Sequence, residues 1–195
     1  MKNLMLILLA VALQSCQSYN HKLYTKGTLN SSNTESINGE YASQPILAVM
    51  TKFHPFPMDK HIDSSLLLSL DRSLNTNNID YGILNHYTFS IQVFDNKRVS
   101  IKCLQGGRCL KTYDLEVQLK SDGFLYLKNR NVRPILIPFI CGAIDVTKLR
   151  FSRDSEGDLI VDKTNHRSGA FLFIAFFSVS NTESRCIYKK IKPLS

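Results

Sequence analysis

From Tyr87 onward, apolar residues alternate with polar ones, and this period of two predicts half-buried β-strands. The alternation covers residues 87–93, 99–103, 113–119 and 125–127, with the apolar side chains on odd positions. Facing residues in a hairpin must lie on the same face of the sheet, so the alternation also predicts the register. We expect three facing pairs, each closing onto a three-residue loop: Val93 with Val99, Cys103 with Cys109, and Leu119 with Leu125.

This register also places opposite charges across from one another on the polar face. It sets Arg98 opposite Asp114, and Glu116 opposite Lys128. Cross-strand pairs of opposite charge contribute about 0.2–1 kcal/mol each. The polar face is therefore expected to be a solvated sheet surface on which many of the basic residues lie.

The same register predicts a covalent link between two strands. Cys103 and Cys109 would face each other, with Cα atoms about 4.5–5.5 Å apart, which lies inside the range for a disulfide. We therefore predict a cross-strand disulfide between Cys103 and Cys109. The alternative is two buried free thiols that pack as small apolar side chains.

Upstream of these strands the chain predicts one short helix. Leu66, Leu70 and Leu74 follow one another at a spacing of four and so lie along one helical face. Asp63 or Ser64 is suited to cap the amino-terminal end. Between residues 45 and 57, three prolines argue against a long regular element.

Downstream of residue 128 the pattern predicts further strands. The run 134–140 is wholly apolar, and Pro138 restricts it to an edge strand or to an apolar flap over a barrel mouth. Residues 146–151 and 159–162 flank a turn at 154–157 and predict a hairpin. Residues 170–179 are apolar on both faces, which predicts a strand buried on both sides, and 187–191 form a last strand.

The amino terminus has the pattern of an export signal. Lys2 precedes an apolar run over residues 4–13, which is too short to span a bilayer but typical of a secretory signal peptide. The sequence Leu13-Gln14-Ser15-Cys16 resembles a bacterial lipobox. That resemblance implies cleavage before Cys16 and acylation of this residue, so that acyl chains tether the protein to a lipid bilayer. The alternative is an ordinary cleaved signal peptide with an incidental cysteine.

Composition divides the remainder into a tether and a domain. Residues 17–36 are polar and rich in Ser, Asn and Thr, and such a segment buries too little apolar surface to offset the entropy of ordering. We therefore expect a signal peptide over 1–15, a lipidated Cys16 with a flexible tether over 16–36, and one β-barrel domain over 37–195.

The chain is basic, with a formal net charge of +8. A basic excess favours nucleic acid, anionic lipid headgroups or acidic polysaccharide as partners, and an exported protein meets the last two far more often. Because no aromatic residues alternate with the lysines in a stacking array, we do not expect nucleic acid to be a partner.

The sequence holds no familiar catalytic or cofactor motif. It contains no Gly-x-Ser-x-Gly elbow, His-Glu-x-x-His helix, phosphate-binding loop, dinucleotide fingerprint or Cys-x-x-Cys pair. His61 has Asp59 and Asp63 two residues to either side, a spacing that does not share a helical face. We expect no metal, no cofactor and no enzymatic activity.

Taken together, the elements predict an all-β fold, an antiparallel meander of about 8–9 strands closing into a small barrel, with one short N-terminal helix. Asn38-Gly39-Glu40-Tyr41 opens the domain and Gly157-Asp158-Leu159-Ile160-Val161-Asp162 comes late in it. With the lipobox at Cys16, these residues resemble the lipocalin-like lipoproteins of Bacteroidota-type bacteria, Tyr41 standing where lipocalins have Trp. The resemblance implies a lipocalin-like barrel in the cell envelope. Gln17, in place of an Asp that would retain the protein at the inner membrane, favours the outer membrane.

Three functions fit these expectations. The first is a barrel that binds a small apolar or lipidic ligand, with residues 134–140 at its mouth. The second is a structural or interaction lipoprotein with a filled barrel and a protein partner. The third is an unrecognised hydrolase. For the first, the candidate ligand-binding residues are Tyr87, Phe89, Ile135, Phe139, Phe171 and Phe173.

Overall fold

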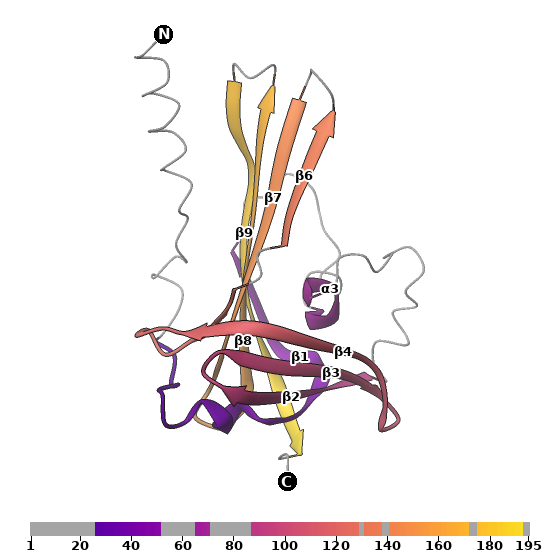
Figure 1. The fold of residues 1–195 in the computed structure, drawn as a ribbon, viewed down its shortest axis with the longest axis vertical. Coiled ribbons are helices and arrows are strands. Elements are labelled where there is room, and N and C mark those ends of the chain that lie inside the picture. The colour runs from indigo at the N-terminus through magenta and orange to yellow at the C-terminus, as the bar shows by residue number, and fades with distance from the viewer. Residues whose placement is uncertain are drawn as a thin grey trace.

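The computed structural model describes residues 26–51, 65–70, 87–128, 131–137, 141–171 and 175–192, and only the backbone over 131–145 and 166–181. Nearly all of it is β-structure (Figure 1). The two short helices are η1 (Thr34–Ile37) and α3 (Leu66–Leu70). The strands are β1 (Gly39–Thr51), β2 (Tyr87–Asp95), β3 (Arg98–Gln105), β4 (Arg108–Leu119), β5 (Leu125–Leu127), β6 (Asn131–Ile137), β7 (Cys141–Arg153), β8 (Leu159–Phe171) and β9 (Ala175–Lys192).

Eight of these strands close into an antiparallel barrel. The sheet order is β5-β4-β3-β2-β1-β9-β8-β7-β6, and β5 also pairs with β7, which closes the ring with β6 outside it. Neighbours in the ring are neighbours in sequence except where β1 meets β9 and where β5 meets β7. The predicted all-β meander barrel is therefore confirmed.

Beyond the ring, part of the sheet continues as an open layer. Residues 39–42 of β1 pair with β2, whereas residues 45–51 pair with β9. β5 pairs with β7 near Phe151, and β6 pairs with the same strand over residues 141–147. The outer parts of β1, β9, β8, β7 and β6, here called the upper sheet, rise above β2, β3 and β4, which cross below them (Figure 1).

Two of the three predicted hairpin registers are confirmed. Val93 lies opposite Val99, and Leu119 lies opposite Leu125. The predicted three-residue loop of the first hairpin is wrong, because Asp95 lies opposite Arg98 and leaves a two-residue turn, with a bulge between Val93 and Asp95. The second register brings the Lys128 Nζ within 3.6 Å of the Glu116 carboxylate, as the charge pattern predicted.

The predicted register between β3 and β4 is wrong by two residues. Gly106 and Gly107, with φ of +58° and +81°, form a two-residue turn, and a bulge follows between Cys103 and Leu104. Such a turn needs positive φ at both central positions, which glycine adopts freely. The turn and the bulge together keep the apolar residues on one face but place Cys103 opposite Lys111 and Arg98 opposite Glu116.

In the later part of the chain, one predicted hairpin is confirmed and one predicted strand is wrong. The hairpin between β7 and β8 turns at residues 154–157 as predicted, with Gly157 at φ +91°. The strand predicted over residues 170–179 is wrong, because β8 ends at Phe171 and β9 begins at Ala175, directly opposite it. β6 pairs with β7 at the end of the sheet order, which confirms the edge-strand alternative for residues 134–137 of the predicted run 134–140. Residues 138–140, Pro138 included, lie outside the described residues.

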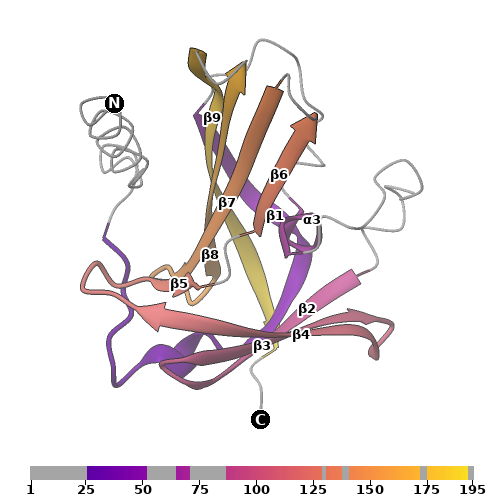
Figure 2. The same ribbon diagram turned by 45° about the horizontal axis from the view of Figure 1, so that its top comes forward.

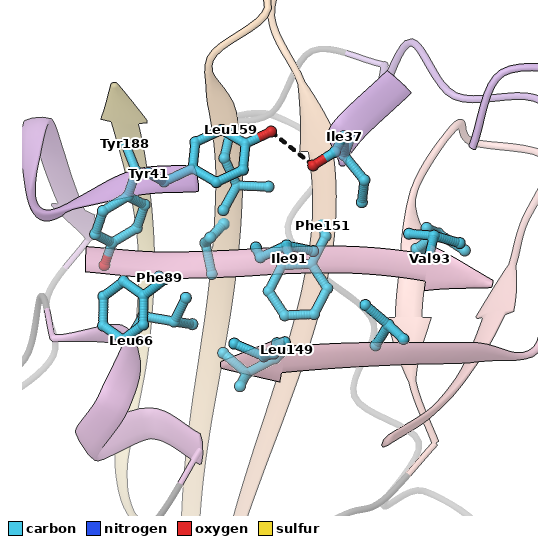
Figure 3. Packing of buried hydrophobic residues seen from close by; sticks show 14 of the residues in the cluster. Ile37, Tyr41, Leu66, Phe89, Ile91, Val93, Leu149, Phe151, Leu159 and Tyr188 are labelled. Atoms are coloured by element: carbon cyan, nitrogen blue, oxygen red, sulfur yellow. Dashed lines mark hydrogen bonds between the residues drawn. The ribbon is translucent and has the colours of Figure 1, made fainter. Parts of the chain in front are cut away.

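The barrel interior is filled by the apolar face of the alternating strands. Figure 3 shows Phe89 and Ile91 of β2 meeting Leu149 and Phe151 of β7. Tyr41 is also buried, and its hydroxyl donates a hydrogen bond to the Ile37 carbonyl at 2.7 Å. The fully buried large side chains include Tyr41, Tyr188, Phe151, Ile37, Leu66, Ile91, Ile101, Leu125, Leu159, Val99 and Val117.

The folded part begins earlier than the sequence predicted. Residues 26–33 with η1 form a strap along one side of the barrel (Figure 2), although residues up to 36 were expected to form the tether. The Gly27 amide donates to the Asp122 carbonyl at 2.8 Å, and the Leu29 amide donates to the Gly123 carbonyl at 3.2 Å. Leu29 and Ile37 are buried in the core. The tether prediction is therefore wrong for residues 26–36.

The strap passes so close to the β4–β5 turn that only glycine fits there. A Cβ on Gly123 would lie 2.2 Å from the Gly27 carbonyl oxygen, whereas a Cβ on Gly107 would meet nothing within 4 Å. The two glycines have nearly equal φ, +80° and +81°, so alanine suffers the same backbone strain at both. Gly107 is therefore a matched control for the steric contact at Gly123.

We expect Gly107→Ala to lower the free energy of unfolding by about 1 kcal/mol through backbone strain. Gly123→Ala should lower it by roughly 2 kcal/mol more, because the methyl group must displace the strap. Urea unfolding of the two variants and the parent chain measures the difference. Equal losses for the two variants would contradict a close contact between strap and turn.

Candidate functional site

The predicted ligand-binding residues are only partly brought together by the described structure. Tyr87 and Phe89 belong to β2, where Phe89 is buried in the core and Tyr87 packs against the same cluster. Ile135 and Phe171 lie on β6 and β8, whose backbone alone is described there. Phe139 and Phe173 fall outside the described residues.

The helix α3 lies above β2, β3 and β4 and beside the upper sheet, at a position here called the mouth (Figures 1 and 2). Its first residue, Leu66, is buried beside Phe89 and Tyr188 (Figure 3). Burial and the neighbouring Cys186 raise the pKa of the Tyr188 hydroxyl, against a hydrogen bond from the Leu66 backbone that lowers it. A leucine from the chain itself therefore fills the apolar space at the mouth. Of the predicted helix, Asp63, Ser64 and Leu74 lie outside the described residues.

A row of charged side chains crosses the outer face of the barrel. Arg150 of β7, Asp162 of β8 and Arg185 of β9 lie opposite one another in register. Arg150 Nε donates to Asp162 Oδ2 at 2.9 Å, and Arg185 donates from Nε to Oδ1 at 2.7 Å and from Nη2 to Oδ2 at 2.8 Å. Asp162 is 0% exposed and Arg150 is 3% exposed. Both oxygens of this buried carboxylate thus accept hydrogen bonds from guanidinium groups.

The row extends to the closing strand β5. Arg150 Nη1 donates to Asp122 Oδ2 at 3.1 Å and to the Tyr126 hydroxyl at 2.8 Å, and that hydroxyl donates to Asp122 Oδ2. The Arg150 guanidinium also lies 4.0 Å from the centre of the Phe124 ring, a cation–π contact. Two carboxylates balance two guanidinium groups, so the cluster is an internally satisfied joint between β5, β7, β8 and β9.

Titration should not disturb this joint near neutral pH. Burial and the hydrogen bond to Asp122 raise the pKa of the Tyr126 hydroxyl. Burial lowers the pKa of Arg150, but the hydrogen bond with Tyr126 and the charge of Asp162 outweigh burial and raise it. Tyr126 therefore stays protonated and Arg150 stays charged.

The cysteines of the β3–β4 hairpin are free thiols in the structure. Cys103 is buried and Cys109 is exposed, and the register places them opposite different residues. Burial, with a contribution from the neighbouring Cys109, raises the pKa of Cys103 to about 11. The predicted facing geometry for a Cys103–Cys109 disulfide is therefore wrong. Cys186 is also a buried thiol, while Cys16 lies outside the described residues.

The described residues show neither a metal site nor a membrane-spanning helix. No group of three or more His, Cys, Asp or Glu side chains among them is placed to hold a metal ion. Within the same part of the chain, both helices are too short to cross a bilayer. His61 and its neighbouring acids lie outside that part.

Among the residues whose side chains are described, three of the exposed large apolar side chains lie close together on β1 in the upper sheet. Ile46, Leu47 and Val49 are 61%, 48% and 48% exposed. Over residues 45–51, β1 pairs with β9 on one side, and no described strand pairs with its other side. The three prolines between residues 45 and 57 argue against a long regular element, so the sequence alone does not predict this part of β1. The run of β-branched and apolar residues after Pro45 was the signal that could have identified it.

Comparison with known proteins gives no relative from which a function could be carried over. No protein-family model, curated protein or solved structure matches the chain. The structure offers three features to consider as sites: the apolar edge of β1, the mouth at α3 and the charged joint. The joint is satisfied internally, which leaves the edge and the mouth as the candidate functional sites.

We expect Arg150→Met to lower the free energy of unfolding by about 3–5 kcal/mol, because it removes the cation shared by two carboxylates. The matched control is Lys128→Met, which breaks the exposed pair with Glu116 and should cost about 0–1 kcal/mol. Urea unfolding measures both. A loss at Arg150 no larger than the loss at Lys128 would show that the joint does not stabilise the barrel.

Proposed function

We propose that the chain is a non-catalytic lipoprotein of the bacterial cell envelope, held on the outer membrane by acyl chains on Cys16. The support is the sequence: a basic start, a short apolar run and the lipobox-like Leu13-Gln14-Ser15-Cys16. Two or more acyl chains on Cys16 would hold the protein stably on the bilayer. The barrel would then act close to the membrane surface.

We propose further that this lipoprotein works by binding an extended segment of a protein partner along β1, with the filled barrel as its scaffold. The observation that carries this proposal is the exposed apolar edge over Ile46, Leu47 and Val49. An exposed sheet edge can add a strand through its backbone groups, while adjacent apolar side chains select the partner.

The composition of the edge supports this role. Natural edge strands usually carry charges that prevent pairing with other chains. No charged residue occurs between Glu40 and Lys52 in the sequence, and Pro45 and the bulges beside it lie at the lower end of the edge. Residues 46–50 therefore form an uncharged segment that is suited to strand addition.

Photo-crosslinking in the native cell tests the partner site. A photoreactive residue at Val49 of the full chain should give a covalent adduct of discrete mass. The same residue at Phe94, which is exposed on β2, should give none. Adding Leu47→Lys to the Val49 probe should reduce the adduct at least about fivefold, because a charge opposes edge pairing.

The crosslinking outcomes separate the possibilities. An adduct of twice the chain mass would identify the partner as a second copy. No adduct at Val49, or equal adducts at Val49 and Phe94, would overturn partner binding at this edge. Acylation is read from the mass of the same purified chain, so a wrong anchor and a wrong partner site are distinguished.

A second candidate function is supported by the mouth. Leu66 packs there against Phe89, one of the predicted ligand-binding residues. An apolar ligand such as a fatty acid could take the place of Leu66 in this aromatic-lined position. The ligand and α3 would then compete for the same space.

Native mass spectrometry of the detergent-solubilised full chain with added palmitic acid tests this competition. Leu66→Ser should raise the bound fraction about tenfold, because burying a leucine contributes roughly 1.5–3 kcal/mol to holding α3 in place. Leu110→Ser, which changes an exposed leucine on another surface, should leave binding unchanged. No binding, or equal binding by both variants, would exclude the mouth as a ligand site.

A further inference from the structure

The outer half of the β3–β4 hairpin, residues 102–113, forms a projection here called the ribbon tip. Every residue from Gln105 to Thr112 is exposed. A Cβ on either turn glycine would meet nothing within 4 Å. The turn lies at the start of β4, at the far end of that strand from the strap (Figure 2). The end of the ribbon therefore points away from the described part of the barrel.

The ribbon tip carries one sign of charge. Its ionisable side chains at Lys102, Arg108 and Lys111 are exposed. No acidic residue occurs in the sequence between Arg98 and Asp114, so the charged residues of the ribbon tip are all cations.

An apolar side chain lies among these charges. Leu110 is 49% exposed and stands between Arg108 and Lys111 in the sequence. The Lys111 ammonium lies 5.2 Å from the centre of the Tyr113 ring, a cation–π contact within the ribbon tip. Exposed apolar residues flanked by Lys and Arg are the combination that binds the interface of an anionic bilayer.

We propose that the ribbon tip binds a membrane surface that carries anionic lipid headgroups. The cations pair with lipid phosphates while Leu110 enters the apolar boundary beneath them. A bilayer satisfies both features at once, whereas an acidic polypeptide would satisfy the charges and leave Leu110 in water.

The distances along the chain agree with a single bilayer contacting both ends of β4. This step rests on the proposed anchor. Lys26 lies ten positions after Cys16, and a chain of that length spans at most about 35 Å. The twelve residues of β4 span about 40 Å from the ribbon tip to the turn under the strap. The anchor and the ribbon tip can therefore both reach the same bilayer.

Hydrogen exchange on vesicles tests the proposal with the full chain. The protein is mixed with an excess of phosphatidylcholine vesicles, or of the same vesicles containing phosphatidylglycerol. The amides of residues 105–112 should exchange at least about fivefold more slowly on the anionic vesicles than on the neutral ones, since each cation contributes about fivefold to surface binding. High salt should remove the difference, because the charges are exposed.

Variants assign the effect to the ribbon tip. Arg108→Glu with Lys111→Glu should abolish the slowing on anionic vesicles, and Leu110→Ser should reduce it. Lys128→Glu, at an exposed lysine on β5's side of the barrel, should leave it unchanged. Far-ultraviolet circular dichroism of each variant checks that the β-fold is kept.

Each remaining outcome overturns the proposal. Equal exchange on both vesicle types would exclude anionic lipid as the ligand. Slowing by added polyglutamate in place of anionic vesicles would assign the ribbon tip to an acidic polypeptide. Cosedimentation of the ribbon-tip double variant with neutral vesicles reports the lipid anchor separately, so failure of the anchor and failure of the ribbon tip give different results.

Discussion

The barrel depends on the pairing of β5 with β7, which closes the ring through only a few backbone contacts. β5 contains three residues and pairs with β7 only through Leu125 opposite Phe151 and Tyr126 opposite Arg150. Two pairs alone would be a weak seam in a ring that must keep a whole apolar interior out of water. The seam is strengthened from outside by Arg150, which joins carboxylates on the β4–β5 turn and on β8.

The strap reinforces the same seam from a second direction. Its backbone binds the carbonyls of Asp122 and Gly123, and the Thr28 amide donates to Ser152 Oγ at 3.1 Å. Ser152 Oγ in turn donates to the Gly123 carbonyl at 3.0 Å. Segments far apart in the sequence therefore meet on one turn, and the order of residues 26–36 follows from those long-range hydrogen bonds.

The sequence predicted the fold well where one strand face is buried and the other is solvated. Alternation alone identified β2 to β5, because a period of two records which face is apolar. It determined only which face each residue occupies, so the extra residue of the β3–β4 bulge shifted the register without breaking the pattern. Around residue 172 the chain is apolar on both faces, and there the pattern could not reveal that it reverses.

The strap, the edge and the mouth could not be predicted from local patterns. Residues 26–36 look like a tether, because their order depends on Asp122 and Gly123 about a hundred positions away. Proline usually interrupts regular structure, but Pro45 lies just beyond the residues of β1 that pair with β2. At such a sheet edge the missing amide of proline is tolerated. Phe89 was correctly placed facing the interior, but nothing in its neighbourhood showed that Leu66 packs beside it.

The pairing of β1 with β9 has a consequence for how the chain reaches its native state. Leu47 lies opposite Ile187, and residues 45–51 of β1 pair with β9. These residues can therefore pair with a neighbouring strand only after β9, the last strand of the chain, is present. A chain that is delivered amino terminus first can form the local hairpins β2 to β5 early, while residues 45–51 of β1, which pair with β9 and not with β2, stay open at both edges. The interval between the emergence of β1 and that of β9 is then the period of greatest risk of aggregation, and a holding chaperone would act on β1.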